Sequence, residues 1–315
     1  MALANGDGIP LIQERITINN LSKMKEKGEA ITALSLYDAS LARFFDEAGG
    51  EVIVVGDSAS MAAMGRPNTL PITMEEMLVF SRSVCRGTKR LFVVGDMPLG
   101  SYEVSSELAV QNALRFMKDV GDRPCNAVKV EINMDYIERV REIAKTCLVV
   151  AHIGLNPNKA EMLGGYRTLG KTKQSAEELC EVALAAEEAK ACMILIESVP
   201  EEVSQVIRES VKIPVLGIAA GRKLDGQLLI GADLLDFYEW PGNRKPRHFK
   251  IYKTEKSGLT PGGLVREAFS WYVRAVKSGE MPGEENVHFL PNDDRPEVAR
   301  YLRDLRSNRA NQPVF

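Results

Sequence analysis

Short apolar runs recur along the chain, and most are separated by segments with the apolar periodicity of a helix. The runs are rich in β-branched residues and lack the apolar/polar alternation of a half-exposed strand, as is typical of parallel sheets covered on both faces. Strands are predicted at residues 30–35, 52–55, 91–95, 127–131, 147–151, 192–196, 213–218 and 233–237. Helices are predicted at residues 37–48, 74–85, 106–120 and 175–189, with capping boxes at Thr73/Glu76 and Ser175/Glu178.

Eight strands that alternate with helices in one chain predict an α/β fold, a (β/α)₈ barrel of the TIM type. A doubly wound open sheet is the alternative, but no G-x-G-x-x-G phosphate turn follows the first strand. Residues 1–15 are predicted to be a mobile N-terminal arm, 16–290 a single catalytic barrel domain, and 291–315 a charged C-terminal tail.

Charge, apolar stretches and cysteine spacing indicate which partners and which compartment to expect. The 315-residue chain has a net charge of -3 and no long block of Lys and Arg, so a nucleic-acid partner is not expected. No apolar stretch approaches the roughly 20 residues that span a bilayer, and the N-terminus lacks the pattern of a signal peptide. The five cysteines form no CxxC pair, which favours reduced thiols and a cytoplasmic location. A small-molecule substrate is the remaining expectation.

Five predicted strands are followed at once by, or end in, a polar side chain: Asp57, Asp96, Glu131, His152 and Glu197. In a barrel the carboxyl ends of the strands meet at one rim, so these side chains are expected to converge there. Lys129 stands two residues before Glu131 and points the same way on a strand, and charges inside a fold often mark a site. The alternative for this pair is a surface salt bridge on an edge strand, and a lone histidine is more often a core residue than a ligand.

The acids Asp57, Asp96 and Glu131 form an oxygen-rich set without clustered Cys or His, which favours Mg²⁺ over Zn²⁺. A hydrogen-bonded acid network without metal is the alternative, but three acids in one pocket repel one another. Mg²⁺ chelated by a 2-oxo acid would polarise the ketone and acidify the neighbouring C–H.

Lys129 and Glu197 supply the other groups that such chemistry needs. Lys129 can neutralise the substrate carboxylate or the enolate oxygen, and Glu197, which ends an apolar strand, is the expected base. The long, glycine-containing segment 156–173 is typical of a loop that closes over a site. Together these features predict enolisation beside a carbonyl, coupled to a change at a carbon–carbon bond.

Longer motifs connect these residues in a fixed order. They read GDSASMAAMGRPNTLPIT (56–73), GDMPLGSY (95–102), VKVE (128–131), AHIGLNP (151–157), GGY (164–166), IESVP (196–200), IPVLGIAAGRKLDGQ (213–227) and SGEMPGEE (278–285). In order and spacing they closely resemble the ketopantoate (3-methyl-2-oxobutanoate) hydroxymethyltransferase family over roughly residues 18–290. That family is similar in fold to the phosphoenolpyruvate mutase and isocitrate lyase barrels.

The resemblance implies transfer of a one-carbon unit from 5,10-methylenetetrahydrofolate to 3-methyl-2-oxobutanoate, a step of pantothenate biosynthesis. It also implies a homo-oligomer, often a decamer in the family. By matching motif, the metal-associated acids are Asp57, Asp96 and Glu131, the substrate contacts are Asp57, Ser58, Asp96 and Lys129, the base is Glu197, and His152 is a pocket residue.

The chain departs from the family pattern at four positions, and the segment 237–250 matches only loosely. Arg66 replaces a usual histidine, Ile132 and Asn133 replace two glycines, and Ala219 replaces a glycine. Arg66 is predicted to be a further substrate anchor, and these changes favour a 2-oxo acid other than 3-methyl-2-oxobutanoate. Two other functions stay open: a related barrel enzyme that breaks or rearranges a C–C or P–C bond without folate, and a non-catalytic homologue, which the retained acids argue against.

Overall fold

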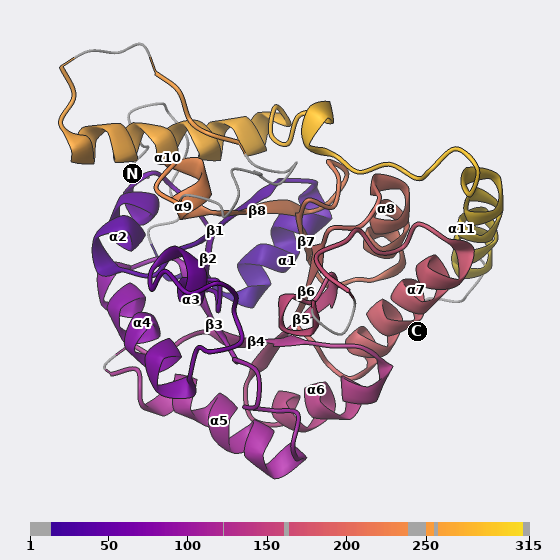
Figure 1. The fold of residues 1–315 in the computed structure, drawn as a ribbon, viewed down its shortest axis with the longest axis horizontal. Coiled ribbons are helices and arrows are strands. Elements are labelled where there is room, and N and C mark those ends of the chain that lie inside the picture. The colour runs from indigo at the N-terminus through magenta and orange to yellow at the C-terminus, as the bar shows by residue number, and fades with distance from the viewer. Residues whose placement is uncertain (1–13, 122, 161–163, 239–249, 255–257, 311–315) are drawn as a thin grey trace.

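Eight parallel strands form a closed barrel at the centre of the molecule (Figure 1). The structure is a computed structural model that describes residues 14–121, 123–160, 164–238, 250–254 and 258–310. The strands are β1 Ile31–Ser35, β2 Val52–Val55, β3 Phe92–Asp96, β4 Ala127–Glu131, β5 Leu148–Gly154, β6 Met193–Glu197, β7 Val215–Ile218 and β8 Gly226–Ile230. Each strand pairs with the next along the chain, and β8 pairs with β1, so the predicted barrel is confirmed.

The last strand is not where the sequence pattern suggested. The predicted strand at 233–237 is wrong, because that segment begins inside the short helix α9 (Gly231–Leu234). The strand that closes the barrel precedes it and starts at Gly226, where a Cβ atom would lie 2.3 Å from the carbonyl oxygen of Ile31. A residue without a side chain is therefore required where β8 meets β1, and that residue breaks the apolar run by which a strand is recognised.

Helices surround the barrel, and Figure 1 shows them as a ring outside the strands. The α-helices are α1 Ile18–Lys27, α2 Ala39–Glu47, α3 Ala59–Ala62, α4 Met74–Gly87, α5 Ser106–Lys118, α6 Ile137–Ala144, α7 Lys173–Glu188, α8 Glu201–Ser210, α10 Pro261–Ser278 and α11 Arg295–Ala310. Short 3₁₀ turns are η1 Met134–Tyr136, η2 Pro157–Lys159 and η4 Glu284–Asn286. The capping box of Thr73 and Glu76 is present at α4, whereas α7 begins earlier than predicted and is capped by Thr172 rather than Ser175.

The core has two layers. One fills the barrel interior with alternate strand residues such as Val54, Val94 and Leu195, and the other packs the outer strand faces against the helices. The interior layer is closed at its amino-terminal end by α1, whose Leu21 and Met24 are buried in it. The candidate site residues lie at the opposite, carboxyl-terminal end of the barrel.

The segments outside the strand–helix repeat also pack on the barrel. Helix α10 lies against β1 and α2, and α11 lies against α7 and α8, with Val298 and Leu302 buried. The predicted charged tail thus includes a packed helix, while nearly all of the predicted N-terminal arm, 1–13, lies outside the described residues, as does most of the loosely matching segment 237–250.

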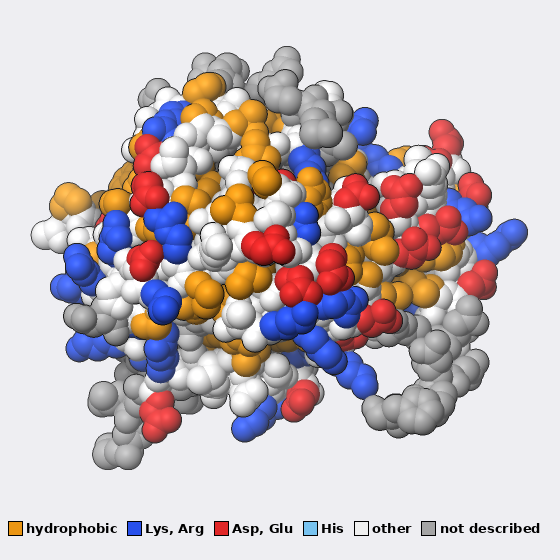
Figure 2. All heavy atoms as spheres, turned by 90° about the horizontal axis from the view of Figure 1, so that it is seen from below, with side chains coloured by type: hydrophobic (Ala, Val, Ile, Leu, Met, Phe, Trp, Pro, Cys, Tyr) orange, Lys and Arg blue, Asp and Glu red, His pale blue; other side chains and the backbone are white. Residues whose placement is uncertain are grey.

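Charged side chains of both signs share the surface (Figure 2), and the cysteines are unpaired. Figure 2 shows a face on which basic and acidic side chains are interspersed among apolar ones. All five cysteines are free thiols. Within the described ranges, the protein has no helix with both the length and the apolar character of a membrane span.

Candidate active site

Strand β4 sends two charged side chains into the barrel. Alternation along the strand puts Ala127, Lys129 and Glu131 on the interior face, while Val128 and Val130 join the outer core. Lys129 and Glu131 are 3 % and 1 % exposed. The alternative of a surface salt bridge is therefore wrong, and both charges lie inside the fold.

Lys129 is the centre of the buried charges. Its Nζ lies 2.9 Å from Asp96 Oδ1, 3.9 Å from Glu131 Oε1 and 3.2 Å from His152 Nδ1. A lysine ammonium can only donate, so Nδ1 of His152 is the acceptor and its Nε2 carries the proton. Burial and the neighbouring Lys129 both hold the pKa of His152 well below its usual value, so the imidazole is neutral.

The protonated nitrogen of His152 faces Glu197. His152 Nε2 lies 3.4 Å from Glu197 Oε2, and the Glu197 side chain is 19 % exposed. The two strands approach closely here: Gly154, at φ +90°, has no room for a Cβ atom, which would lie 2.3 Å from the Glu197 carbonyl. Glu197 therefore stands at the cavity wall with a neutral imidazole N–H beside it and a route to solvent.

Asn158 connects the acids at the other side of the site. Its side-chain amide donates to Asp57 Oδ2 at 2.9 Å, and its backbone N–H donates to Glu131 Oε2 at 3.2 Å. The hydroxyl of Thr69 donates to Asn158 Oδ1 at 2.8 Å, and the backbone N–H of Asp57 donates to Asp96 Oδ2 at 2.9 Å. The loop after β5 and the loop after β2 are thus joined through the acids.

A group of hydroxyls flanks Asp57. Ser58 Oγ lies 2.8 Å from the hydroxyl of Tyr37 and 3.5 Å from Ser35 Oγ. A Cβ atom on Gly56 would lie 2.9 Å from both serine hydroxyls, so glycine leaves the space that they occupy. Burial raises the pKa of Tyr37 well above its usual value, so these groups are neutral donors and acceptors for a substrate oxygen.

Burial and mutual repulsion raise the pKa values of two acids in the site, Asp96 and Glu131. Burial raises the pKa of Asp96 to about 7, with Lys129 opposing the rise and Asp57 adding to it. Burial likewise raises the pKa of Glu131 well above its usual value. Burial lowers the pKa of Lys129, but Asp96 and the other acids outweigh this and keep it charged. The site carries more negative than positive charge and attracts either protons or a cation.

The residues fit Mg²⁺ as a partly solvated ion. In the described ranges, no three Asp, Glu, His or Cys side chains converge as a preformed metal cage. Mg²⁺ usually takes one or two carboxylates and completes its shell with water and substrate oxygens. Glu131 Oε1 is buried and accepts no hydrogen bond from a described group, so an acceptor oxygen is unused beside Asp57 and Asp96.

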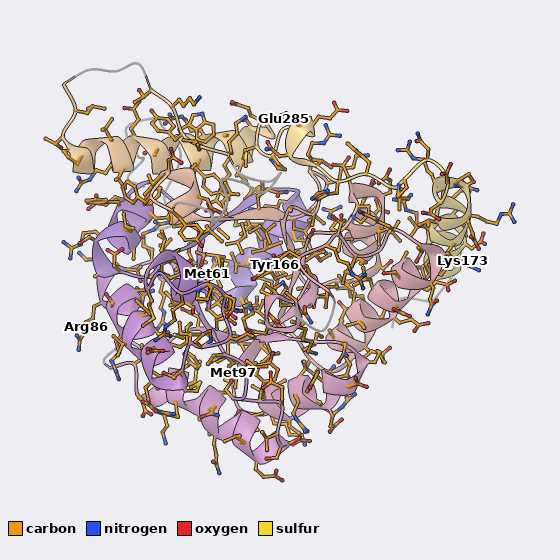
Figure 3. The ribbon with its side chains drawn as sticks, in the orientation of Figure 1. Met61, Arg86, Met97, Tyr166, Lys173 and Glu285 are labelled. Atoms are coloured by element: carbon orange, nitrogen blue, oxygen red, sulfur yellow. The ribbon has the colours of Figure 1, made fainter. Side chains whose placement is uncertain are left out.

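One cavity of about 950 Å³ at the carboxyl end of the barrel is lined by Asp57, Ser58, Asp96, Lys129, Glu131, His152 and Glu197. Its apolar wall includes Met61, Leu155, Leu195, Ile218 and Leu228. In Figure 3, Met61 and Tyr166 lie over the middle of the barrel, whereas Arg86 and Lys173 lie on helices at the outer edge of the molecule.

A family model described as ketopantoate hydroxymethyltransferase matches residues 15–284. The chain belongs to this family. It is 39% identical over 280 residues to the 3-methyl-2-oxobutanoate hydroxymethyltransferase of Clostridium botulinum (strain Loch Maree / Type A3), covering 89% of this chain and 98% of the relative. It is 37% identical over 280 residues to the protein of the same name from Bacillus cereus (strain G9842), covering 89% and 96%.

Solved structures share the fold at low identity. A phosphonopyruvate hydrolase complex with oxalate and Mg²⁺ matches with a TM-score of 0.51 and 15% identity, covering 94% of this chain and 99% of that one. A phosphoenolpyruvate phosphomutase from Streptomyces platensis subsp. rosaceus matches with a TM-score of 0.52 and 15% identity, covering 70% and 83%. The expected resemblance to phosphoenolpyruvate mutase barrels is confirmed at the level of fold.

Three of the four departures from the ketopantoate hydroxymethyltransferase pattern lie away from the cavity wall. The guanidinium of Arg66 holds both carboxylate oxygens of Glu76, at 2.6 and 2.9 Å. Ile132 is buried in the outer core, and Asn133 is exposed and donates to Asp135. None of the three is among the residues that line the cavity.

Ala219 is the departure that does line the cavity. Its φ is +53°, in the left-handed region where the glycine usual in the family adopts the backbone without strain. The methyl group therefore narrows the wall at the end of β7 and costs some backbone strain.

Several cavity or contact residues gave no signal in the sequence. Asn158 and Thr69 stand in loops and reach the acids only through tertiary contacts. Arg167, Lys171 and His288 line the outer part of the cavity, and His288 comes from the segment after α10. Position at a strand end, the signal that identified the acids, does not exist for loop residues.

Proposed function

We propose that this protein transfers a hydroxymethyl group from 5,10-methylenetetrahydrofolate to 3-methyl-2-oxobutanoate, with Mg²⁺ as cofactor, as a step of pantothenate biosynthesis. The chain belongs to this family, and one observation supports the proposal most strongly. A single cavity is lined by all of the predicted catalytic residues: Asp57, Asp96, Lys129, Glu131, His152 and Glu197. The names of the relatives, which include 3-methyl-2-oxobutanoate hydroxymethyltransferase, support the choice of reaction.

The substrate is held between Lys129 and the hydroxyls beside Asp57. Its carboxylate and ketone oxygens find the charged Lys129 on one side and Ser58 on the other, while the alkyl group faces apolar residues such as Leu195 and Leu228. Lys129 is fixed by Asp96 at 2.9 Å, so it is already oriented when negative charge develops on the ketone oxygen.

Asp57 and Asp96 would hold Mg²⁺, with Glu131 as a further acceptor, and the bound ion would supply Lewis-acid polarisation of the 2-oxo acid. Asn158 keeps two of these acids in place through its hydrogen bonds to Asp57 and Glu131.

Glu197 is the base. It takes the proton from the substrate carbon next to the ketone, and Nε2 of the neutral His152 imidazole lies 3.4 Å from its carboxylate. The substrate carbon then bonds to the methylene carbon of the donor, and the C–N bonds from that carbon to the donor break. Water supplies the oxygen of the new hydroxyl group. The second proton of this water and the proton held by Glu197 pass to the two donor nitrogens, and the donor leaves as tetrahydrofolate.

The substrate named for the family, 3-methyl-2-oxobutanoate, is favoured over another 2-oxo acid. Arg66, Ile132 and Asn133 do not line the cavity, so they give no reason to expect a dicarboxylate or phosphonate. Only Ala219 changes the wall, by one methyl group, a change that shifts discrimination by roughly 1–3 kcal/mol at most. The homo-oligomer expected from the family is part of the same proposal, and sedimentation equilibrium measures its size.

The test is formation of ketopantoate from 3-methyl-2-oxobutanoate, 5,10-methylenetetrahydrofolate and Mg²⁺, followed by mass spectrometry. A series of 2-oxo acids run in parallel, with and without the donor, separates the alternatives. Donor-independent cleavage of a C–C or P–C bond would replace this proposal with a lyase, and absence of any turnover would replace it with a non-catalytic role.

A further inference from the structure

We propose that the outer part of the cavity is the binding site for the one-carbon donor, a folate. Tyr166 lies against an aromatic ring of the donor, and Arg167 and Lys171 bind the carboxylates of its glutamate tail. The inference rests on the proposed function and adds to it the residues that recognise the second substrate.

The first observation is space. The cavity measures about 950 Å³, near the upper end of the range of about 300–1,000 Å³ found for pockets of drug-sized ligands. A five-carbon acid held at Lys129 and Ser58 fills only the strand-end part of it. The outer part is walled by Met61 and Pro67 from the loop after β2 and by Tyr166 from the loop after β5.

The second observation is charge. Arg167 and Lys171 line the outer cavity, are exposed, and have no ion-pair partner within the described ranges. Two other arginines form ion pairs: Arg66 with Glu76 and Arg222 with Glu201. Two uncompensated cations at the entrance attract an anionic ligand, and the buried Lys129 is already occupied by the 2-oxo acid. The outer pair therefore matches a second anion.

The third observation is an aromatic side chain at the entrance. Tyr166 is 56 % exposed although it lines the cavity, and Figure 3 shows it over the middle of the barrel near Met61. An exposed ring that is followed directly by a cation offers stacking and charge from one short segment. A planar, aromatic ligand with an anionic tail requires that combination, whereas an aliphatic 2-oxo acid does not.

The test uses the double variant Arg167→Ala/Lys171→Ala and two one-carbon sources. With 5,10-methylenetetrahydrofolate we expect KM for the donor to rise about tenfold or more, because each lost charge-assisted hydrogen bond weakens binding by about that much. With free formaldehyde as the one-carbon source, and for KM of the 2-oxo acid, the variant should equal wild type. A tetrahydropterin donor without the glutamate tail should bind the variant and wild type equally.

Two controls isolate the charges. Lys173→Ala removes an equally exposed cation on α7 that pairs with Glu177 and lies outside the cavity, and it should leave KM unchanged. The charge-conserving variant Arg167→Lys/Lys171→Arg should stay near wild type, which excludes misfolding as the cause. An unchanged donor KM in a folded alanine variant overturns the proposal. A wild type that uses formaldehyde but not the folate overturns the choice of donor in the proposed function, and the outer site with it.

Discussion

The side-chain amide of Asn158 donates to Asp57 across 2.9 Å, while the backbone N–H of the same residue donates to Glu131. One loop residue therefore fixes the distance between two acids that come from β2 and β4. Its own orientation is set by Thr69, which occupies the amide oxygen.

Replacing Asn158 by Leu should weaken Mg²⁺ binding about 10- to 100-fold, as found for groups that orient metal ligands. Titration calorimetry with Mg²⁺ or Mn²⁺ on the substrate-free protein measures this without relying on turnover. Thr69→Val should act in the same direction but more weakly. Unchanged affinity in a folded Asn158→Leu protein would show that the acids keep their positions without this residue.

Glu197→Gln should leave the fold intact and slow exchange of the substrate α-proton with D₂O by about 10²–10⁴-fold, the usual contribution of a general base. Proton NMR of 3-methyl-2-oxobutanoate follows the exchange without the one-carbon donor. His152→Gln keeps a donor near Glu197 and should have a smaller effect. If exchange is as fast in folded Glu197→Gln as in wild type, the base is another group.

Removal of divalent cations should abolish turnover, and Mg²⁺ should restore it. One lysine cannot balance the negative charge of three buried acids, so a cation is needed to keep them ionised. Dialysis against EDTA followed by titration with Mg²⁺ measures this. Full turnover after exhaustive dialysis would remove the metal from the mechanism.

Asp96 should make the stability of the metal-free protein fall as pH rises. Its pKa is raised to about 7 in the native state, so between about pH 4 and pH 7 the native protein holds a proton that the unfolded chain has lost. Stability from this group is complete below about pH 4 and is lost as pH rises through about 7. The depressed pKa of His152 acts in the opposite direction below about pH 6.5.

Urea unfolding of wild type and Asp96→Asn across pH 4–8 therefore isolates the Asp96 contribution as a difference. The difference in unfolding free energy should change through that window in EDTA and should become smaller with saturating Mg²⁺, which replaces the proton. A difference independent of pH would mean that Asp96 is ionised throughout.

Arg66→His should leave the order of kcat/KM across a series of 2-oxo acids unchanged, because the Arg66 guanidinium holds Glu76 rather than facing the cavity. The matched comparison is Ala219→Gly, which does alter the wall and should change kcat/KM for larger 2-oxo acids. A new substrate preference in Arg66→His would require Arg66 to leave Glu76 and enter the site during turnover.

Leu21→Ala should lower the free energy of unfolding by about 2–5 kcal/mol, the usual cost of removing a fully buried leucine side chain. Leu21 of α1 closes the barrel at the end opposite the cavity, so KM values should be unchanged in the folded variant. Val79→Ala, at a position 55 % exposed on α4, is the control and should have little effect. Comparable losses in both variants would mean that α1 does not close the core.

The sequence was sufficient for the barrel and for the acids but not for the loops. Seven strands were found because each is a short, mostly apolar run, and the acids were found because strand ends converge. β8 was missed because Gly226 and Gln227 interrupt its apolar pattern where the backbones meet. Asn158 could not be found, since it contacts Asp57 across 101 residues through a loop whose path no periodicity predicts.

Because β1 pairs with β8, the barrel cannot close during translation until β8 has been synthesised. Every acid, base and cation assigned to the chemistry lies between residues 57 and 197, so the ribosome has synthesised all of them before Gly226 is added. Until that strand emerges, β1 has no partner on one side and the strand ends have no common rim. A fragment that ends after Glu197 would contain every catalytic residue but could not close the barrel, so it would be inactive. Activity therefore depends on β8, a strand that carries no catalytic residue.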